Sequence, residues 1–269
     1  MSVPTTIEWT QETWNPTTGC DRVSAGCDHC YALTLAKRLR GMGAAKYQTD
    51  GDPRTSGPGF GVATHPDTLD APLRWRTGRT VFVNSMSDLF HHEVPVTFIG
   101  SVWNTMGLTP RHTYQVLTKR PARARTLLTQ WARVGWSWQR HDLMWCGPLD
   151  GPLPNVWLGT SIESDDHTIR AEHLRRTPAA VRFISAEPLL GPLPSLDLTG
   201  IDWLIAGGES GPHARPMDPT WVRDLRDRCQ EAGVAFFFKQ WGGRTPKANG
   251  RHLDGRTWDQ YPRPDSPIW

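Results

Sequence analysis

Short apolar runs alternate with amphipathic segments along most of this chain, and no other feature constrains its fold as strongly. Six such runs lie between residues 80 and 238, and a polar turn follows each of them. Apolar strands that alternate with amphipathic helices form parallel βαβ units. The six expected strands are Thr80–Val83, Thr113–Leu117, Val156–Leu158, Val181–Ile184, Asp202–Ala206 and Ala235–Phe238. A seventh strand is expected around Ile7–Trp9.

Helical spacing of apolar residues fills most of the intervals between these strands. The expected helices are Tyr31–Arg40, Val96–Met106, Ala122–Arg133, Asp165–Arg176 and Pro219–Ala232, the last capped by Asp218. Residues 49–72 and 134–154 read as irregular insertions. Six or seven βα units with long insertions favour a partial, open (β/α)6–7 barrel, with a doubly wound sheet as the alternative. Residues 1–243 would form this single domain, and residues 244–269 a polar C-terminal tail.

The bulk properties are those of one large globular domain. The chain has 269 residues, of which 38% are hydrophobic and 21% are charged. No apolar run approaches 18 residues, and the N-terminal residues lack the features of a signal peptide. We therefore expect a cytoplasmic protein with no membrane span, whose thiols stay reduced. A net charge of +3 is compatible with nucleic acid without arguing for it.

Three of the five cysteines lie close together, just before the first expected helix. They are Cys20, Cys27 and Cys30, whereas Cys146 and Cys229 are isolated. Three clustered thiols suit a metal centre that keeps one coordination position open. A [4Fe–4S] cluster held by three thiolates has such a position on its fourth iron. The alternative is a zinc site whose fourth ligand is a neighbouring His, Asp or a distant residue.

Acidic residues recur where the expected strands end. Ligands of parallel α/β folds bind at the carboxyl ends of the strands, so these acids would share one face. Each acid alone is typical of a helix cap or a surface position, but their recurrence predicts a site for a ribose, an amino group, a metal or acid–base chemistry. The four acids are Asp88, Glu163, Glu187 and Glu209. Lys119 and Lys239 also follow strands and could pair with these acids or bind a phosphate.

Other polar groups give weaker signals. The turn Gly207–Gly211 lets backbone approach a ligand but lacks the dinucleotide-binding spacing. The His-His-Glu sequence at 91–93 is expected to be a solvated helix start rather than a metal site. A solvated face or phosphate contacts would explain the arginines Arg120, Arg123, Arg125 and Arg133. Core and loop packing, with base stacking as a second role, would explain Trp9, Trp14, Trp75, Trp136, Trp138 and Trp241.

The motifs at the strand ends also resemble a known family. The loop sequence Cys-Asp-His-Cys-Tyr-Ala is followed in order by Ser-Met-Ser-Asp, Leu-Thr-Lys-Arg, Gly-Thr-Ser-Ile-Glu, Ser-Ala-Glu-Pro-Leu-Leu-Gly, Gly-Gly-Glu-Ser-Gly and Phe-Lys-Gln-Trp-Gly. Over roughly residues 5–242, this set resembles a family of phage and bacterial proteins that looks like a divergent branch of the radical S-adenosylmethionine superfamily. The resemblance implies a partial (β/α) barrel with a [4Fe–4S] cluster at the carboxyl ends of the strands.

By this resemblance Cys20, Cys27 and Cys30 are the cluster ligands, and the fourth iron chelates the methionyl group of S-adenosylmethionine. His29 takes the place of an aromatic residue beside the adenine. The resemblance implies further cofactor contacts by Ser85, Ser87 and Asp88 to the methionyl amino group, and by Ser161 and Glu163 to ribose or carboxylate. The spacing C-x6-C-x2-C departs from the usual C-x3-C-x2-C of the superfamily.

The activity that follows from this resemblance is radical chemistry. An electron from an external donor would cleave S-adenosylmethionine to methionine and a 5′-deoxyadenosyl radical, which abstracts hydrogen from a substrate. The tryptophan content and slight basicity lean toward a nucleic acid or nucleotide as that substrate. The alternative is a nucleic-acid-binding or partner-binding protein that zinc or a structural iron–sulfur cluster stabilises, without radical chemistry.

Overall fold

A computed structural model gives the structure of residues 5, 7–134, 136–140, 143–147 and 151–262. The side chains of Trp136, Trp138 and Cys146 lie outside what it describes. In the described part of the chain, no helix is long and apolar enough to cross a membrane.

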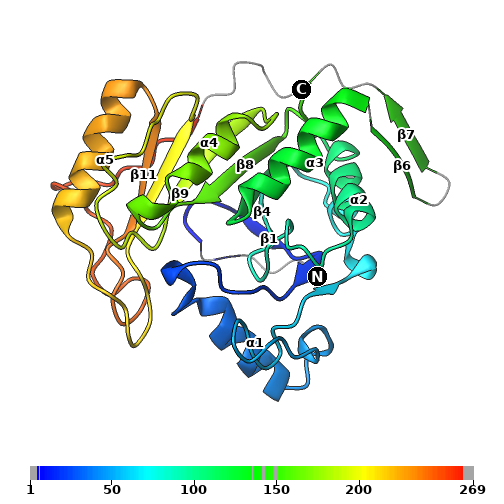
Figure 1. Ribbon diagram of the computed structural model, residues 1–269, viewed down its shortest axis with the longest axis horizontal. Helices are drawn as coiled ribbons and strands as arrows, with labels where there is room; N and C mark the ends of the chain where they lie inside the picture. The colour runs from blue at the N-terminus through cyan, green and yellow to red at the C-terminus, as the bar shows by residue number, and fades with distance from the viewer. Residues whose placement is uncertain (1–4, 6, 135, 141–142, 148–150, 263–269) are drawn as a thin grey trace.

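Seven parallel strands form one curled sheet, a half-barrel, which confirms the expected α/β fold and partial barrel (Figure 1). The strands are β1 (Glu12–Trp14), β4 (Thr80–Val83), β5 (Thr113–Thr118), β8 (Val156–Ser161), β9 (Val181–Ala186), β10 (Trp203–Gly207) and β11 (Ala235–Gln240). They lie side by side in this order, and each neighbouring pair is parallel. Because each crossover returns to the next strand, the sheet follows barrel topology rather than that of a doubly wound sheet.

Helices cover the outer face of this sheet, and Figure 1 shows α3 and α4 in front of β8. The α-helices are α1 (Tyr31–Gly41), α2 (Val96–Gly107), α3 (Pro121–Val134), α4 (Ile169–Arg175) and α5 (Pro219–Ala232). As expected, the Asp218 carboxylate caps α5 by accepting a hydrogen bond from the Thr220 N–H at 2.8 Å. The part expected as a helix from residue 165 begins with the 3-10 helix η5 (Asp165–His167) before α4.

Shorter elements occupy the insertions. Strand β2 (Thr17–Thr18) pairs with β3 (Ala63–Thr64), and β6 (Trp136–Arg140) pairs with β7 (Leu143–Gly147), both antiparallel. The insertion at 134–154 therefore carries a hairpin. The sequence did not predict this hairpin, because the segment has no clear period of apolar residues. Four further 3-10 turns are η1 (Ala25–Cys27), η2 (Ala45–Tyr47), η3 (Pro66–Thr68) and η4 (Pro72–Arg74).

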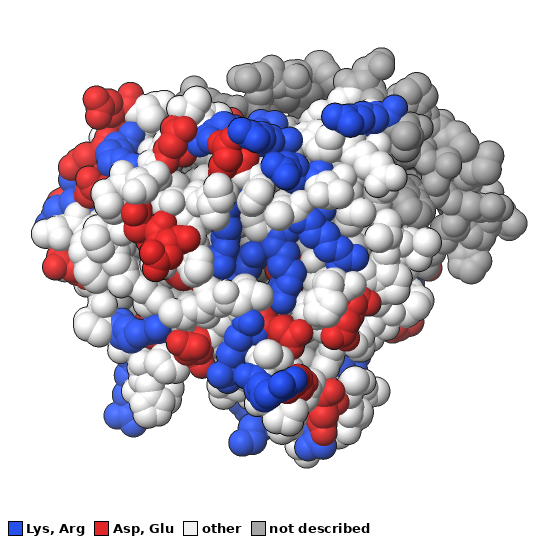
Figure 2. Space-filling model, in the orientation of Figure 1, with Lys and Arg blue, Asp and Glu red and all other residues white. Residues whose placement is uncertain are grey.

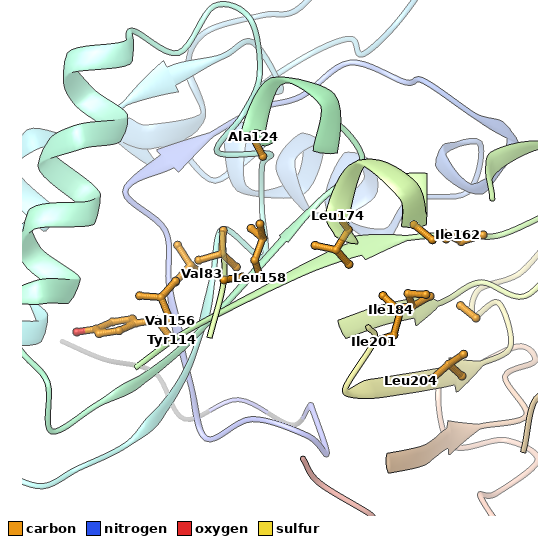
Figure 3. Packing of buried hydrophobic residues seen from close by; sticks show 14 of the residues in the cluster. Val83, Tyr114, Ala124, Val156, Leu158, Ile162, Leu174, Ile184, Ile201 and Leu204 are labelled. Carbon is orange, nitrogen blue, oxygen red and sulfur yellow. The ribbon is translucent and has the colours of Figure 1, made fainter. Parts of the chain in front are cut away.

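The sheet separates two packed cores, because successive side chains of a strand point to opposite faces. The larger core lies between the sheet and helices α2 to α5. Figure 3 shows part of it, where Leu158 of β8 and Leu204 of β10 lie with Leu174 of α4 in one apolar cluster. The cysteine in α5, Cys229, is fully buried in this core, so it has a packing role.

Aromatic side chains fill the concave face, which we call the lumen. The cluster there includes Phe82, Phe183, Trp203 and Phe237, all from strands. Trp9 inserts among them, with ring centroids 4.7 Å from Phe82 and 6.2 Å from Trp203. This level of the lumen is therefore a packed core rather than a pore.

The position of Trp9 also corrects the expected first strand. Residues 7–9 form no strand, and β1 comes later, at Glu12–Trp14. The apolar run at 7–9 is explained by insertion into the lumen, where Trp9 is 3% exposed. Trp14 and Trp75 are buried as well, and Trp241 packs against the larger core. Packing, the first of the two expected roles, therefore accounts for Trp9, Trp14 and Trp75.

The segment beyond residue 243, expected as a tail, packs on β11. The Phe238 N–H donates to the Trp258 carbonyl at 2.9 Å, and the Gln260 N–H donates to the Phe236 carbonyl at 3.2 Å. Leu253 and Trp258 are buried in the larger core. Residues 250–260 are therefore part of the packed half-barrel.

Candidate functional site

The loop that carries the cysteines, residues 19–30, lies across the carboxyl ends of the strands; we call it the cysteine loop. At its start the Gly19 N–H donates to the Met86 carbonyl beyond β4 at 3.1 Å. Gly19 has a φ of 86°, and a Cβ there would lie 2.1 Å from the Gly61 carbonyl oxygen, so only glycine fits. At its end Cys30 is the N-cap residue of α1. The loop is thus held between two structural elements.

The three thiols of this loop are free and half-buried. They lie near one another, since the charge of Cys27 acts on both Cys20 and Cys30. Burial raises the pKa of Cys20 to about 12, with a smaller contribution from Asp88, and burial also raises the pKa of Cys30. Both groups are therefore neutral thiols at pH 7, and a metal that binds them must displace their protons.

Arg120 contacts the first cysteine directly. Its Nη1 donates to Sγ of Cys20 at 3.3 Å and to Oδ2 of Asp88 at 3.1 Å. Its Nη2 donates to the Asp21 carbonyl at 3.2 Å. The guanidinium is largely buried, with 14% of the side chain exposed. A fixed positive charge with an N–H aimed at sulfur favours the thiolate form of Cys20.

Asp88, predicted to bind a cofactor, holds Arg120 and the chain after β5. Its carboxylate accepts from the Thr118 hydroxyl at 2.7 Å and from the Lys119 N–H at 3.0 Å, in addition to Arg120. It also accepts from the Phe90 N–H at 3.0 Å. With both oxygens engaged, Asp88 positions Arg120 beneath Cys20.

Ser85 and Ser87, predicted beside Asp88, join the end of β4 to the segment before the cysteine loop. The Ser87 hydroxyl donates to the Thr17 carbonyl at 2.9 Å. The Ser85 hydroxyl donates to Oδ1 of Asn15 at 3.2 Å, and its carbonyl accepts from the Tyr31 hydroxyl at 2.5 Å. Both serines therefore position the chain that leads to Cys20.

Glu163, predicted after β8, anchors the middle of the cysteine loop. Its side chain is fully buried, and one oxygen accepts a hydrogen bond from the Ser24 hydroxyl. The other oxygen accepts from Nη1 of Arg170 at 2.9 Å, which compensates the buried charge. Gly26 packs on this carboxylate, because a Cβ there would lie 2.9 Å from Cγ of Glu163.

Glu209, predicted after β10, anchors the third part of the loop. It accepts from Nδ1 of His29 at 3.0 Å and from Nε of Arg215 at 2.9 Å. Burial acts to raise its pKa, but the hydrogen bonds of Arg215 and His29 outweigh burial and lower the pKa of Glu209 to about 2. Arg215 also donates to the Ala25 carbonyl at 2.9 Å. His29 and Glu209, which the sequence predicted separately, thus form one contact.

Polar side chains line the lumen between the aromatic cluster and the cysteine loop; we call them the lumen tier. Each of them lies two or four positions along the chain beyond a residue of the aromatic cluster. Because successive side chains of a strand point to opposite faces, each of them points toward the lumen. The lumen tier consists of Lys119, Ser161, Ser185, Glu187 and Lys239. Glu187 and Lys239 form an ion pair, and both pack beside Gly207 of β10.

Part of this tier has no partner. Ser161 and Ser185 are 3% and 2% exposed, and among the described residues nothing hydrogen-bonds to their hydroxyls. Lys119 is half-buried and forms no ion pair within the described part of the chain. Its charge acts on Cys30, which places it near the cysteine loop. The predicted Ser161 and Glu187 therefore face the lumen, where Glu187 is paired with Lys239 and the Ser161 hydroxyl has no hydrogen bond to a described residue.

A second group of possible metal ligands lies beside the loop. Asp21, His91 and His92 are the one set in the described part of the chain whose donor atoms all lie within 4.8 Å of one another. Nδ1 of His91 accepts from the Glu93 N–H at 3.3 Å, so Nε2 carries the proton and donates to Asp21 at 3.0 Å. The hydrogen bond between His91 and Asp21 thus explains why these two side chains lie close together. His91 is fully buried, which corrects the expected solvated position, whereas His92 and Glu93 are exposed.

The cysteines of the loop are not arranged as a preformed zinc site. A tetrahedral zinc ion, with Zn–S of about 2.3 Å, holds thiolates about 3.8 Å apart. No set of three ligands within 4.8 Å includes a cysteine among the described residues. A four-iron cluster seats each thiolate on a different iron and so accepts a wider triangle. His29 is the one histidine of the loop, and its Nδ1 is already hydrogen-bonded to Glu209.

Sequence reasoning missed several residues of the site. Arg215 and Ser24 carry no motif, so no local signal could have identified them. Arg120 and Arg123 were grouped with two other arginines as a solvated or phosphate-binding face, yet both point inward. Arg123 donates to the His91 carbonyl, and its Nη2 donates to the Val94 carbonyl at 2.9 Å.

Comparison with known proteins identifies one family. The model of a family described as "Protein of unknown function (DUF5131)" matches residues 4–262. No curated protein and no solved structure matches the chain.

Proposed function

The chain belongs to the DUF5131 family, and we propose that it is an iron–sulfur enzyme of the radical S-adenosylmethionine type. One observation carries this proposal. Three cysteines of a single loop are held across the carboxyl end of a parallel half-barrel, near Lys119, which forms no ion pair with any described residue. Ligands of parallel barrels bind at this end.

The residues present fit a [4Fe–4S] cluster held by Cys20, Cys27 and Cys30. When bound with S-adenosylmethionine, such a cluster would pass one electron from an external donor to the sulfonium and release methionine and a 5′-deoxyadenosyl radical. Arg120 donates a hydrogen bond to Cys20. Hydrogen bonds to the sulfurs are a lever by which proteins set cluster potentials.

The lumen tier is the proposed binding site for the organic ligands. The hydroxyls of Ser161 and Ser185 can each donate and accept a hydrogen bond, which suits the hydroxyls of a ribose. Lys119 supplies the charge for a carboxylate or phosphate. The aromatic cluster beneath the tier excludes water from the closed end of the lumen.

The acids Asp88, Glu163 and Glu209 act on the ligands indirectly in this proposal. Each of them binds a part of the cysteine loop or the arginine beneath it. They therefore orient the thiols, as partners of metal ligands commonly do.

The proposal is tested by anaerobic reconstitution with iron and sulfide, followed by reduction in the presence of S-adenosylmethionine. We expect about four irons and four sulfides per chain, a broad visible absorbance, and formation of 5′-deoxyadenosine. Cys20→Ala, Cys27→Ala and Cys30→Ala should each lose the cluster. Cys229→Ala is the matched control, because this buried cysteine lies in α5, and it should retain iron.

The outcomes separate this proposal from its alternative. A colourless protein with one tightly bound zinc would overturn the cluster and favour a metal-stabilised binding protein. A protein that binds a full cluster but forms no 5′-deoxyadenosine would support the assignment of the cluster and overturn the radical chemistry.

A further inference from the structure

A basic groove runs along the outer surface between α3 and α4, outside the lumen. Its volume is about 510 Å³, and its lining residues are Arg125, Thr126, Thr129, Gln130, Arg133 and Arg176. Three arginines, two threonines and a glutamine offer hydrogen-bond donors, and no acid lines the groove. Figure 2 shows Lys and Arg side chains gathered over this part of the molecule.

Two of the three arginines of the groove have no acidic partner among the described residues. Arg125 and Arg133 form no ion pair with any described residue, whereas Arg176 pairs with Glu172 at 2.6 Å. The hydroxyl of Thr129 is buried and has no hydrogen-bond partner in the described part of the chain. The same charges reach His173 on α4, whose pKa is lowered by burial and then by Arg125.

The groove has the length and donor set of a phosphate-binding track. Its α3 residues span positions 125 to 133, which is about 12 Å along the helix axis and is enough for about three consecutive phosphates of an extended strand. Arginine, threonine and glutamine are side chains that proteins use for phosphate and sugar contacts. We propose that this groove binds the sugar–phosphate backbone of a nucleic acid strand.

The first turn of α3 connects the groove to the site at the mouth of the half-barrel. Helix α3 begins directly after Arg120, which contacts Cys20. Arg125 follows five residues later, about 8 Å along the helix axis. A strand bound in the groove would therefore approach the cysteine loop at the first turn of α3. The proposal does not depend on the metal centre, because no groove residue contacts the loop.

The test is a fluorescence anisotropy titration of the full chain with a short fluorescein-labelled single-stranded oligodeoxynucleotide. Three phosphate contacts predict that a plot of the logarithm of the association constant against the logarithm of the salt concentration has a slope of about −2 or steeper. This slope corresponds to a loss of about 20-fold in affinity between about 50 and 200 mM salt. The variant Arg125→Gln/Arg133→Gln/Arg176→Gln should lose at least about tenfold in affinity at fixed salt, and its slope should fall by about 2.

A charge-matched control makes the test specific. Arg38→Gln/Arg74→Gln/Arg76→Gln removes the same charge from exposed arginines outside the groove and should leave affinity and slope unchanged. Circular dichroism would confirm that both variants are folded, and Cys20→Ala should bind like the wild type. Absence of binding by the wild type, or equal losses in both triple variants, would overturn the proposal. Competition by inorganic phosphate as effective as by unlabelled oligonucleotide would overturn it too, because it would indicate a site for a free anion.

Discussion

At the scale of single residues, Arg120 determines the surroundings of the first thiol. It is the one side chain in the described part of the chain whose guanidinium contacts a cysteine of the loop, and Asp88 fixes its position. The N–H and the positive charge both favour the more negative state of a bound cluster, which is the reduced state. Arg120 is therefore a positioning and tuning residue of the proposed enzyme.

Removal of this contact should lower the reduction potential of the cluster. In Arg120→Gln, the reduced cluster should lose about 1 kcal/mol of stabilisation relative to the oxidised cluster. The reduction potential should therefore fall by an amount on the order of 50 mV. A potentiometric titration followed by electron paramagnetic resonance measures the shift. Arg120→Lys keeps the positive charge, so its reduction potential should lie between those of Arg120→Gln and the wild type.

Arg123→Gln is the control for this measurement. Arg123 lies in the first turn of α3, three residues after Arg120, but it donates to backbone carbonyls and not to sulfur. Its substitution should reduce stability and leave the potential unchanged. A potential that is equal in the wild type and Arg120→Gln would contradict the assigned role.

At the scale of elements, the cysteine loop is held by the ends of several strands at once. Ser24 binds Glu163 after β8, and His29 binds Glu209 after β10. Gly26 lies between these anchors against the buried Glu163 side chain. The geometry of the three thiols therefore depends on close contact between the loop and the sheet.

Gly26→Ala tests this contact. The added methyl would lie 2.9 Å from Cγ and 3.0 Å from Cδ of Glu163, whose carboxylate is held by Arg170 and Ser24. We expect a loss of about 1–3 kcal/mol in the free energy of unfolding and weaker iron retention after reconstitution. Urea denaturation and iron analysis measure the two effects.

Gly41→Ala is the matched control in the same segment. A Cβ at this last residue of α1 would meet no atom within 4 Å, so the change should be neutral or stabilise by up to about 1 kcal/mol. Equal iron retention in Gly26→Ala and the wild type would show that the loop does not need close packing on Glu163.

At the scale of the whole molecule, the half-barrel is completed by chain segments from both ends. Trp9 fills the lumen from the N-terminal side, and residues 250–260 pack along β11. Near the C-terminal end, the Tyr261 ring lies 5.2 Å from that of Trp203. The open sheet is thus stabilised by side chains that lie outside its strands.

Trp9→Ala should therefore destabilise the entire fold. Loss of this 3% exposed indole leaves a cavity among the lumen aromatics, and we expect a decrease of about 3–5 kcal/mol in the free energy of unfolding. Chemical denaturation followed by circular dichroism measures it. Met42→Ala, at a side chain that is 69% exposed, should change stability by no more than about 0.5 kcal/mol. Similar values for the two variants would contradict a packed lumen.

Much of the fold was predictable because its signals are local. Six of the seven strands and all five helices appear where apolar periodicity predicted them, within a few residues. The first strand was misplaced because an apolar run can fill a lumen as well as form a strand. The hairpin of β6 and β7 was missed because its sequence has no clear period, and the packing of residues 250–260 was missed because it depends on contacts with the distant strand β11.

The amino-acid sequence alone determined the βα order, the three clustered cysteines and the acids at the strand ends, since each follows from residue type and spacing. Only the tertiary structure decided what those acids do. Glu163 and Glu209 bind the cysteine loop, and Asp88 binds Arg120, whereas the Ser161 and Ser185 hydroxyls face the lumen without a hydrogen bond to any described residue. The reason is physical, because a buried carboxylate needs charged or hydrogen-bonding partners, and some of those partners, such as Ser24 for Glu163 and His29 for Glu209, come from distant parts of the chain.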